Sequence, residues 1–238
     1  MTLRQSIWMF AILTALAGCD RPSDAVGQNA QPETATEGSS DGASSTPALD
    51  RIRERLETPD PDDMIVIAHR ACWHEGPENS IAAIRACIDM GVEVIEIDVH
   101  RSRDGVLVVL HDESVDRMTN GSGRVDALSA AEIGALRLRA GAGGEQAALT
   151  DHRIPTLREV FEATRGETVF NLDTKGEVIL DTIALVREMG VARQALFKTA
   201  LPPTDPVVKA MDLPEGSYFM PVVRESAGSL ADHVASFA

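Results

Sequence analysis

Apolar runs that end in ionisable residues recur along this chain, and few folds accommodate such a series. The runs stop at His69-Arg70, at Glu96 and Asp98, at His111-Asp112, and at Asp173 and Lys175. Each run is short and mostly apolar, as expected for strands buried on both faces of a parallel sheet. Because ligands bind at the carboxyl ends of parallel strands, we expect these residues to share one site. The pattern therefore indicates an enzyme with an α/β fold.

Predicted strands alternate with predicted helices from residue 64 onward. We expect strands at residues 64–69, 92–99, 168–173, 195–198 and 217–223, and helices after residue 79 and at residues 178–189. Asn79 is predicted to cap the first helix, whose apolar residues recur at helical spacing, and Gly91 to end it. This order of elements is typical of a parallel sheet whose strands are joined by helices.

The run at residues 106–111 is an exception, because only residues 100–105 separate it from the strand before it. Parallel neighbours need a crossover of about a dozen residues or more, so this connection is predicted to be an antiparallel hairpin. Asp104-Gly105 is a strong signal for a two-residue turn. With that turn, Asp98 lies directly opposite His111, and their Cβ atoms are about 5 Å apart.

Glu96 and Asp98 are two residues apart on a predicted strand, so both carboxylates point to the same face. Asp173, at the end of its own strand, is the natural third member of the group. Carboxylate oxygens suit a hard divalent cation, so these residues are candidate ligands for one Ca²⁺ or Mg²⁺ ion. The alternative is a buried ionic cluster without metal, in which Arg70 and Lys175 neutralise the carboxylates.

His69 and His111 are the candidate proton-transfer groups. A single histidine at a strand end is more often a hydrogen-bonding residue, but two imidazoles beside a cation can divide proton removal and proton donation between them. Arg70 offers a planar fork for phosphoryl oxygens, and Lys175 offers a point charge. These two residues are the candidate phosphate-binding groups.

Six short motifs together resemble the glycerophosphodiester phosphodiesterase family. They are Ile67-Ala68-His69-Arg70, Pro77-Glu78-Asn79-Ser80, Glu96-Ile97-Asp98-Val99, Asp104-Gly105, Val109-Leu110-His111-Asp112 and Ile154-Pro155-Thr156-Leu157. The resemblance implies a (β/α) barrel of the triosephosphate isomerase type, shared with phosphatidylinositol-specific phospholipase C. It implies that the two histidines are the acid/base pair, that Glu96 and Asp98 bind the divalent metal, and that Arg70 and Lys175 hold the phosphate.

The reaction implied by the resemblance is metal-dependent hydrolysis of glycerophosphodiesters to glycerol 3-phosphate and an alcohol. The glycerol hydroxyl of the substrate would attack first, and water would then open the cyclic phosphate. Two other functions stay open on the sequence. One is a phospholipase of the same barrel that acts on lysolipids or sphingolipids, and the other is an inactive envelope lipoprotein that retains the site.

The chain departs from the family pattern in several places. Ala71 replaces the usual glycine after His-Arg, which tests whether this backbone needs a positive φ. Asp173 replaces the common glutamate and is one methylene shorter. Residues 113–153 resemble a family insertion whose loop at residues 117–123 matches imperfectly, with Met118 where threonine is usual. We expect this insertion to be a glycine-rich surface cover that shapes substrate access.

The number of predicted barrel strands is also lower than the family implies. Without the hairpin strand there are five, whereas such a barrel closes with eight strands and typically needs about 250 residues. We therefore expect a barrel domain at residues 64–238 that is incomplete at its C-terminus. A truncated sequence, a second chain that completes the barrel, or an inactive product would each account for this.

The first 19 residues read as an export signal with an apolar stretch too short to span a bilayer. Leu16-Ala17-Gly18-Cys19 resembles a bacterial lipobox, which implies a lipid on Cys19 and a periplasmic-facing, membrane-anchored protein in the cell envelope. The alternative is a buried amphipathic helix with a chance cysteine. Residues 20–63 are predicted to be a flexible tether, ending in a short docking helix at residues 49–56.

Composition limits the partners and leaves the cysteines open. The formal net charge of −15 would repel a phosphate backbone, so a nucleic-acid partner is not expected, whereas a small phosphodiester is. Cys72 and Cys87 lack the spacing of a zinc site. Export permits a disulfide between them, but we favour two unpaired, buried thiols.

Overall fold

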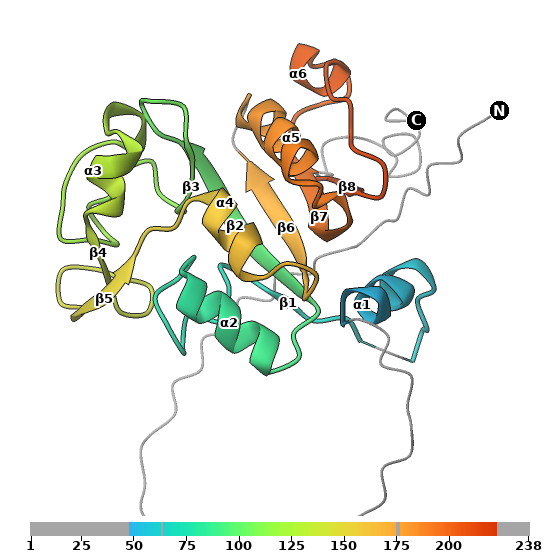
Figure 1. Ribbon diagram of the computed structural model, residues 1–238, viewed down its shortest axis with the longest axis horizontal. Helices are drawn as coiled ribbons and strands as arrows, with labels where there is room; N and C mark the ends of the chain where they lie inside the picture. The colour runs from blue at the N-terminus through green and yellow to red at the C-terminus, as the bar shows by residue number, and fades with distance from the viewer. Residues whose placement is uncertain (1–47, 63, 175–176, 223–238) are drawn as a thin grey trace, which may run out of the picture.

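The computed structural model describes residues 48–62, 64–174 and 177–222 (Figure 1). Its main sheet contains five parallel strands in chain order, which are β1 (Ile67–Ala68), β2 (Val94–Arg101), β6 (Val169–Thr174), β7 (Ala195–Thr199) and β8 (Tyr218–Pro221). Their positions overlap the five predicted barrel strands. The register aligns Asp98 of β2 with Asp173 of β6, and Asp173 with Lys198 of β7. Charged residues from three neighbouring strands therefore lie at one level of the sheet.

Helices cover one face of this sheet. They include α2 (Ile81–Asp89), α4 (Leu157–Ala163) and α5 (Val178–Met189). Two short helices follow along the chain, η2 (Ala192–Gln194) before β7 and α6 (Pro206–Lys209) before β8. Apolar side chains of the three longer helices pack against Ile95 and Ile97 of β2 and Phe170 of β6. Burying each such side chain contributes about 1.5–3 kcal/mol, so this layer provides much of the stability of the fold.

The other face of the sheet changes from apolar to charged along the strands. Val94, Val169 and Leu196 lie at the beginning of β2, β6 and β7, and helix α1 (Ala48–Glu57) packs against them through Leu49 and Leu56. This is the docking helix expected from the sequence. Side chains on one face of a strand recur every second residue, so Glu96 and Asp98 share the face of Val94. Helix α1 thus covers the apolar end of this face.

The segment between β3 (Leu107–Val109) and α4 is folded as a unit with its own small core. It contains η1 (Val125–Ala127), α3 (Ala130–Gly134) and the antiparallel pair β4 (Arg137–Arg139) and β5 (Leu149–Arg153). Figure 1 shows α3, β4 and β5 together on the left. Val108 and Leu110 pack there against Met118, Ile133 and Leu138. The insertion therefore has a fixed shape.

Strand β3 pairs antiparallel with β2, but the register differs by one residue from the predicted one. Val99 pairs with Val109, and the Leu110 N–H donates to the Asp98 carbonyl, so Asp98 does not face His111. The turn has three residues because Ser102 pairs with Val106 around Gly105, whose φ is +84°. A left-handed residue in third position is the usual way to close a three-residue hairpin loop, so the two-residue turn that Asp104-Gly105 predicts is wrong by one residue.

Cys72 and Cys87 form a disulfide, so the prediction of two unpaired thiols is wrong. Cys87 lies on the buried face of α2, and the loop after β1 folds back over this helix, which brings the two Cα atoms to 5.4 Å. The bond closes a loop with a sequence separation of 15, for which chain entropy predicts a stabilisation of about 3 kcal/mol. It joins the loop that carries Arg70 to the helix layer.

Three further predictions concern residues beyond the described ranges. The signal segment with Cys19 and most of the predicted tether lie outside the described residues, as does Lys175. Within residues 48–62, 64–174 and 177–222, no helix has the length and apolar character needed to cross a membrane.

Candidate active site

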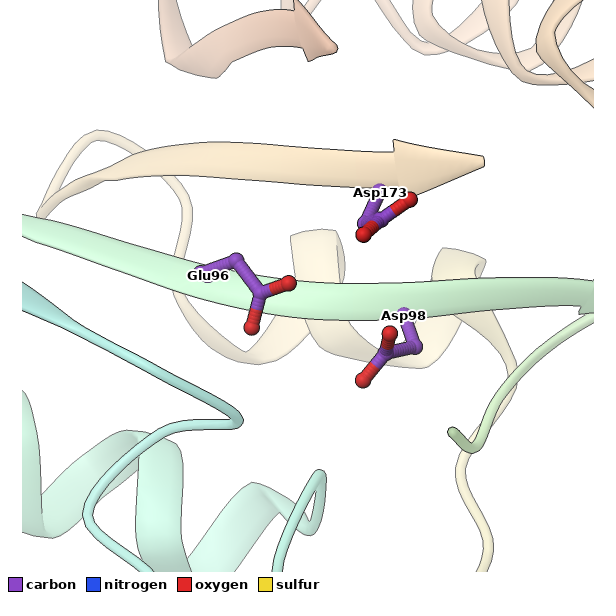
Figure 2. Close-up of side chains that lie close together, drawn as sticks. All are labelled: Glu96, Asp98 and Asp173. Atoms are coloured by element: carbon purple, nitrogen blue, oxygen red, sulfur yellow. The ribbon is translucent and has the colours of Figure 1, made fainter. Parts of the chain in front are cut away.

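Three carboxylates meet at the charged end of the sheet. Glu96 and Asp98 extend from β2 and Asp173 from β6, and Figure 2 shows the three side chains gathered at neighbouring positions. One oxygen from each lies within 4.8 Å of the others. Glu96 is 3% exposed and Asp98 is 1% exposed. The structure thus brings together the three residues that the sequence proposed as metal ligands.

The electrostatic environment of this cluster favours a bound cation. Burial, and next the negative charge of Asp98, raise the pKa of Glu96 to about 7. A buried carboxylate with a like charge beside it ionises readily only when a positive charge compensates it. Hard oxygen donors in this number fit Ca²⁺ or Mg²⁺.

Lys198 is the residue of the cluster that sequence reasoning missed. Its Nζ atom lies 2.7 Å from Asp173 Oδ2 and 3.5 Å from Glu96 Oε1. Burial opposes its charge, but the hydrogen bond to Asp173 and that carboxylate's charge outweigh this effect and raise the pKa of Lys198. A signal was present, because Lys198 also follows an apolar run near the end of a strand.

Arg70 reaches the carboxylates from a left-handed turn after β1. Arg70 and Ala71 have φ values of 56° and 62°. The Arg70 backbone N–H donates to Glu96 Oε2 over 2.8 Å, and its Nε lies 3.9 Å from Asp98 Oδ2. That Nε is buried without a hydrogen-bond partner among the described residues. The positive φ at Ala71 explains a preference for glycine there, and strain of about 1–3 kcal/mol is typical of such positions in sites.

The two predicted proton-transfer histidines differ in exposure, which is 68% for the His69 side chain and 36% for the His111 side chain. His69 Nε2 lies 4.0 Å from Glu96 Oε2. Partial burial and the positive charge of Arg70 lower the pKa of His69, so its ring is mostly neutral at pH 7. His111 is held through Nδ1, which lies 2.7 Å from Asp112 Oδ1. Hydrogen bonds from Arg117 and, less strongly, from His111 lower the pKa of Asp112 to about 2.

Asn79 supports the cluster, whereas the sequence predicted it to cap a helix. Its Nδ2 donates to Asp98 Oδ2 over 3.0 Å, and its Oδ1 accepts from the Asp98 backbone N–H over 3.2 Å. Ser80 is the actual cap of α2, since its hydroxyl oxygen accepts from the Ala83 N–H. Asn79 and Ser80 are adjacent, and either residue type can cap a helix. Asn79 has a positive φ, whereas an N-cap residue typically has extended backbone, so Ser80 takes the N-cap position.

Comparison with known proteins gives the same family as the motifs. The model of the Glycerophosphoryl diester phosphodiesterase family matches residues 69–202. A glycerophosphodiester phosphodiesterase from Caldanaerobacter subterraneus is 45% identical over 119 residues, which cover 49% of this chain and 47% of that protein. Glycerophosphodiester phosphodiesterase 1 of Mus musculus is 38% identical over 135 residues, covering 56% of this chain and 40% of the relative. The chain thus spans about half the length of the curated relatives it matches.

Solved structures show the same fold. A glycerophosphoryl diester phosphodiesterase from Parabacteroides distasonis superposes with a TM-score of 0.66 at 23% identity, over 79% of this chain and 64% of that one. A glycerophosphodiester phosphodiesterase from Agrobacterium tumefaciens gives 0.50 at 32% identity, over 57% of each chain. The parallel sheet with its helix layer is therefore an α/β fold of the kind these proteins share.

Proposed function

We propose that this protein hydrolyses glycerophosphodiesters to glycerol 3-phosphate and an alcohol. The chain belongs to the glycerophosphoryl diester phosphodiesterase family. The observation that carries the proposal is the convergence of three carboxylates with the Arg70 guanidinium, whose Nε has no hydrogen-bond partner among the described residues. A phosphoryl oxygen is a suitable acceptor for that donor. The five described parallel strands are proposed to belong to an eight-stranded barrel.

Glu96, Asp98 and Asp173 are the proposed ligands of one divalent cation, Ca²⁺ or Mg²⁺. When bound, such an ion polarises a phosphoryl oxygen and stabilises negative charge on it. Lys198 neutralises part of the carboxylate charge on the side of Asp173. Asn79 fixes the orientation of Asp98 through its two hydrogen bonds. These contacts keep the cluster in one geometry before substrate binds.

His69 and His111 are the proposed acid/base pair. The lowered pKa of His69 leaves its ring able to accept a proton at neutral pH, which suits removal of a proton from the attacking hydroxyl. His111 is bound to Asp112 through Nδ1, so in the doubly protonated ring the Nε2–H is the proton proposed to pass to the departing alkoxide, which leaves the neutral Nδ1–H ring. Arg70, and Lys175 as proposed from the family motif, would stabilise charge on the phosphoryl oxygens.

The direct test is an assay of the purified protein on glycerophosphocholine and glycerophosphoethanolamine, with glycerol 3-phosphate measured as product. We expect release of glycerol 3-phosphate from at least one of them, and weaker competition from lysophosphatidylcholine. Preferred cleavage of the lysolipid would favour the phospholipase. No hydrolysis of any phosphodiester, with added Ca²⁺ or Mg²⁺, would contradict the proposal.

We also propose that the protein is lipid-anchored through Cys19 and faces the periplasm. The lipobox-like Leu16-Ala17-Gly18-Cys19 supports this, as does the disulfide, because oxidising compartments favour such bonds. In a bacterial host that processes lipoproteins, we expect the protein in the membrane fraction, with acyl chains on Cys19 detected by mass spectrometry. Cys19→Ser should prevent the acylation. Equal membrane association of that variant, without acyl chains on the wild type, would refute the anchor.

A further inference from the structure

Arg117 connects two sides of the site that come from different segments of the chain. Its Nε donates to Asp112 Oδ2 over 2.6 Å, and its Nη2 donates to Asp112 Oδ1 over 2.9 Å. The same Nη2 donates to Glu78 Oε1 over 2.5 Å. Asp112 holds His111 Nδ1, and Glu78 Oε2 accepts from Arg70 Nη1 over 3.3 Å. A continuous series of hydrogen bonds therefore runs from His111 to Arg70.

Glu78 makes this series costly to break. It is 1% exposed, and a buried carboxylate is tolerated only when cations and hydrogen bonds compensate its charge. Each of its oxygens has one guanidinium partner, Arg117 on Oε1 and Arg70 on Oε2. The contact with Arg117 is the shorter one. Without Arg117, Glu78 would therefore depend on Arg70, and would draw that guanidinium away from Asp98.

The insertion holds Arg117 itself in place. The Gly144 N–H donates to the Arg117 carbonyl over 2.8 Å, and Arg117 Nη1 donates to the Ala142 carbonyl. A Cβ atom at Gly143 would lie 2.6 Å from the Arg117 carbonyl oxygen, so only glycine allows this close approach. The carbonyl of Gly141 in the same loop accepts from the Glu78 N–H over 2.9 Å. The loop thus contacts both ends of the Arg117–Glu78 pair.

We propose that Arg117 is a positioning residue that orients His111 through Asp112 and Arg70 through Glu78. The inference rests on the proposed phosphodiesterase function and assigns a role to the insertion, which the sequence predicted only to shape substrate access. An ionised Asp112 only accepts hydrogen bonds, so His111 Nδ1 donates to it whether or not Nε2 also carries a proton, and Nε2 is the nitrogen that exchanges a proton with substrate. The planar guanidinium matters as well as its charge, since it contacts both Asp112 oxygens at once.

Arg117→Met tests the proposal, with Arg124→Met as the matched control. Arg124 lies in the same insertion and also contacts two carboxylates, Asp126 and Glu113, but all three side chains are exposed. We expect Arg117→Met to lower kcat by about 10- to 100-fold, as loss of a supporting partner does around metal ligands, with a smaller change in KM. Arg117→Lys should not restore kcat, because lysine lacks the fork. Equal effects of the two methionine variants, or full activity of Arg117→Lys, would overturn the proposal.

A second measurement separates this proposal from the proposed function. The imidazole nitrogen signals of His111, read by NMR in folded protein at a pH where the ring is neutral, are expected to show the Nδ1–H tautomer in wild type and in Arg124→Met. In Arg117→Met they should show a mixture of tautomers. If the wild type hydrolyses no glycerophosphodiester, the proposed function fails, and the NMR result alone decides the positioning role. An unchanged His111 tautomer in Arg117→Met would then overturn it.

A double variant gives an independent check on the route through Asp112. Arg117 and Asp112 are in direct contact, so their substitutions should couple. We expect Arg117→Met with Asp112→Asn to lower kcat no further than the more damaging single change. Fully additive losses would mean that Arg117 does not act through Asp112, and would refute that part of the proposal.

Discussion

Replacing His69 or His111 with alanine is expected to lower kcat for glycerophosphodiester hydrolysis by about 10²–10⁴-fold, because each ring is proposed to move one proton in the transition state. The fold should be retained, since the His69 side chain is largely exposed and the His111 side chain is partly exposed. Steady-state kinetics with circular dichroism would measure both properties. His152→Ala is the matched control, because His152 is an exposed histidine on β5 and is not one of the candidate catalytic groups.

The two histidines can be distinguished by the leaving group. A phosphodiester that releases p-nitrophenolate needs little protonation of the departing oxygen, so it depends less on a general acid. We expect His111→Ala to lose much less activity on that substrate than on glycerophosphocholine, whereas His69→Ala should lose similar activity on both. Near-normal turnover of either variant on glycerophosphocholine would remove that histidine from the mechanism. The reverse pattern would exchange the two roles.

The second large effect concerns the carboxylate cluster. Asp98→Asn keeps the size of the side chain and removes its charge, and we expect it to lower kcat/KM by at least about 10²–10³-fold, the range for loss of one electrostatic contact to a transition state. Chelation of the wild type should have a comparable effect that added Ca²⁺ or Mg²⁺ reverses. Asp151→Asn, an exposed aspartate on β5, should leave activity unchanged. Full activity after complete chelation would refute a metal requirement.

Metal binding should also appear in stability, without any assay of activity. A cation present at about 100 times its Kd raises the free energy of unfolding by about 2.7 kcal/mol, and Asp98→Asn should reduce that gain. The sign of the pH dependence follows from the raised pKa of Glu96, about 7 in the folded protein. Metal-free protein should lose stability as pH rises from about 4.5 through 7, because the unfolded chain releases this proton more readily. The cation should oppose that loss, and a metal-independent Tm at pH 7 would contradict the ligand assignment.

Several parts of the site were accessible from the sequence because they depend on local rules. Glu96 and Asp98 share a face since side chains alternate along any strand, and Asp173 joins them since parallel strands end at one edge of the sheet. The same rule would have selected Lys198, had it been applied to the strand at residues 195–199. The docking helix was also predictable, because Leu49, Ile52 and Leu56 recur at helical spacing.

Other features depended on choices among alternatives that are locally equivalent. A hairpin closed by two or by three residues fits the same Asp104-Gly105 signal, yet one extra residue moves His111 past Asp98. Asn79 and Ser80 are both good caps, and only the backbone of the folded turn selects Ser80 and frees Asn79 for Asp98. Cys72 can pair with Cys87 only because the loop after β1 folds back over α2.

Two rules were enough to specify which carboxylates gather and at which end of the sheet: side chains alternate between the two faces of a strand, and parallel strands run in the same direction. Both follow from backbone geometry that every residue obeys. The series from His111 through Arg117 and Glu78 to Arg70 required packing between distant segments. Its members lie up to 47 residues apart, from Arg70 to Arg117, and the contact between Arg117 and Glu78, which joins the two halves of the series, exists only because the insertion closes over the turn after β1. Such contacts depend on the three-dimensional path of the chain, which residue spacing does not encode.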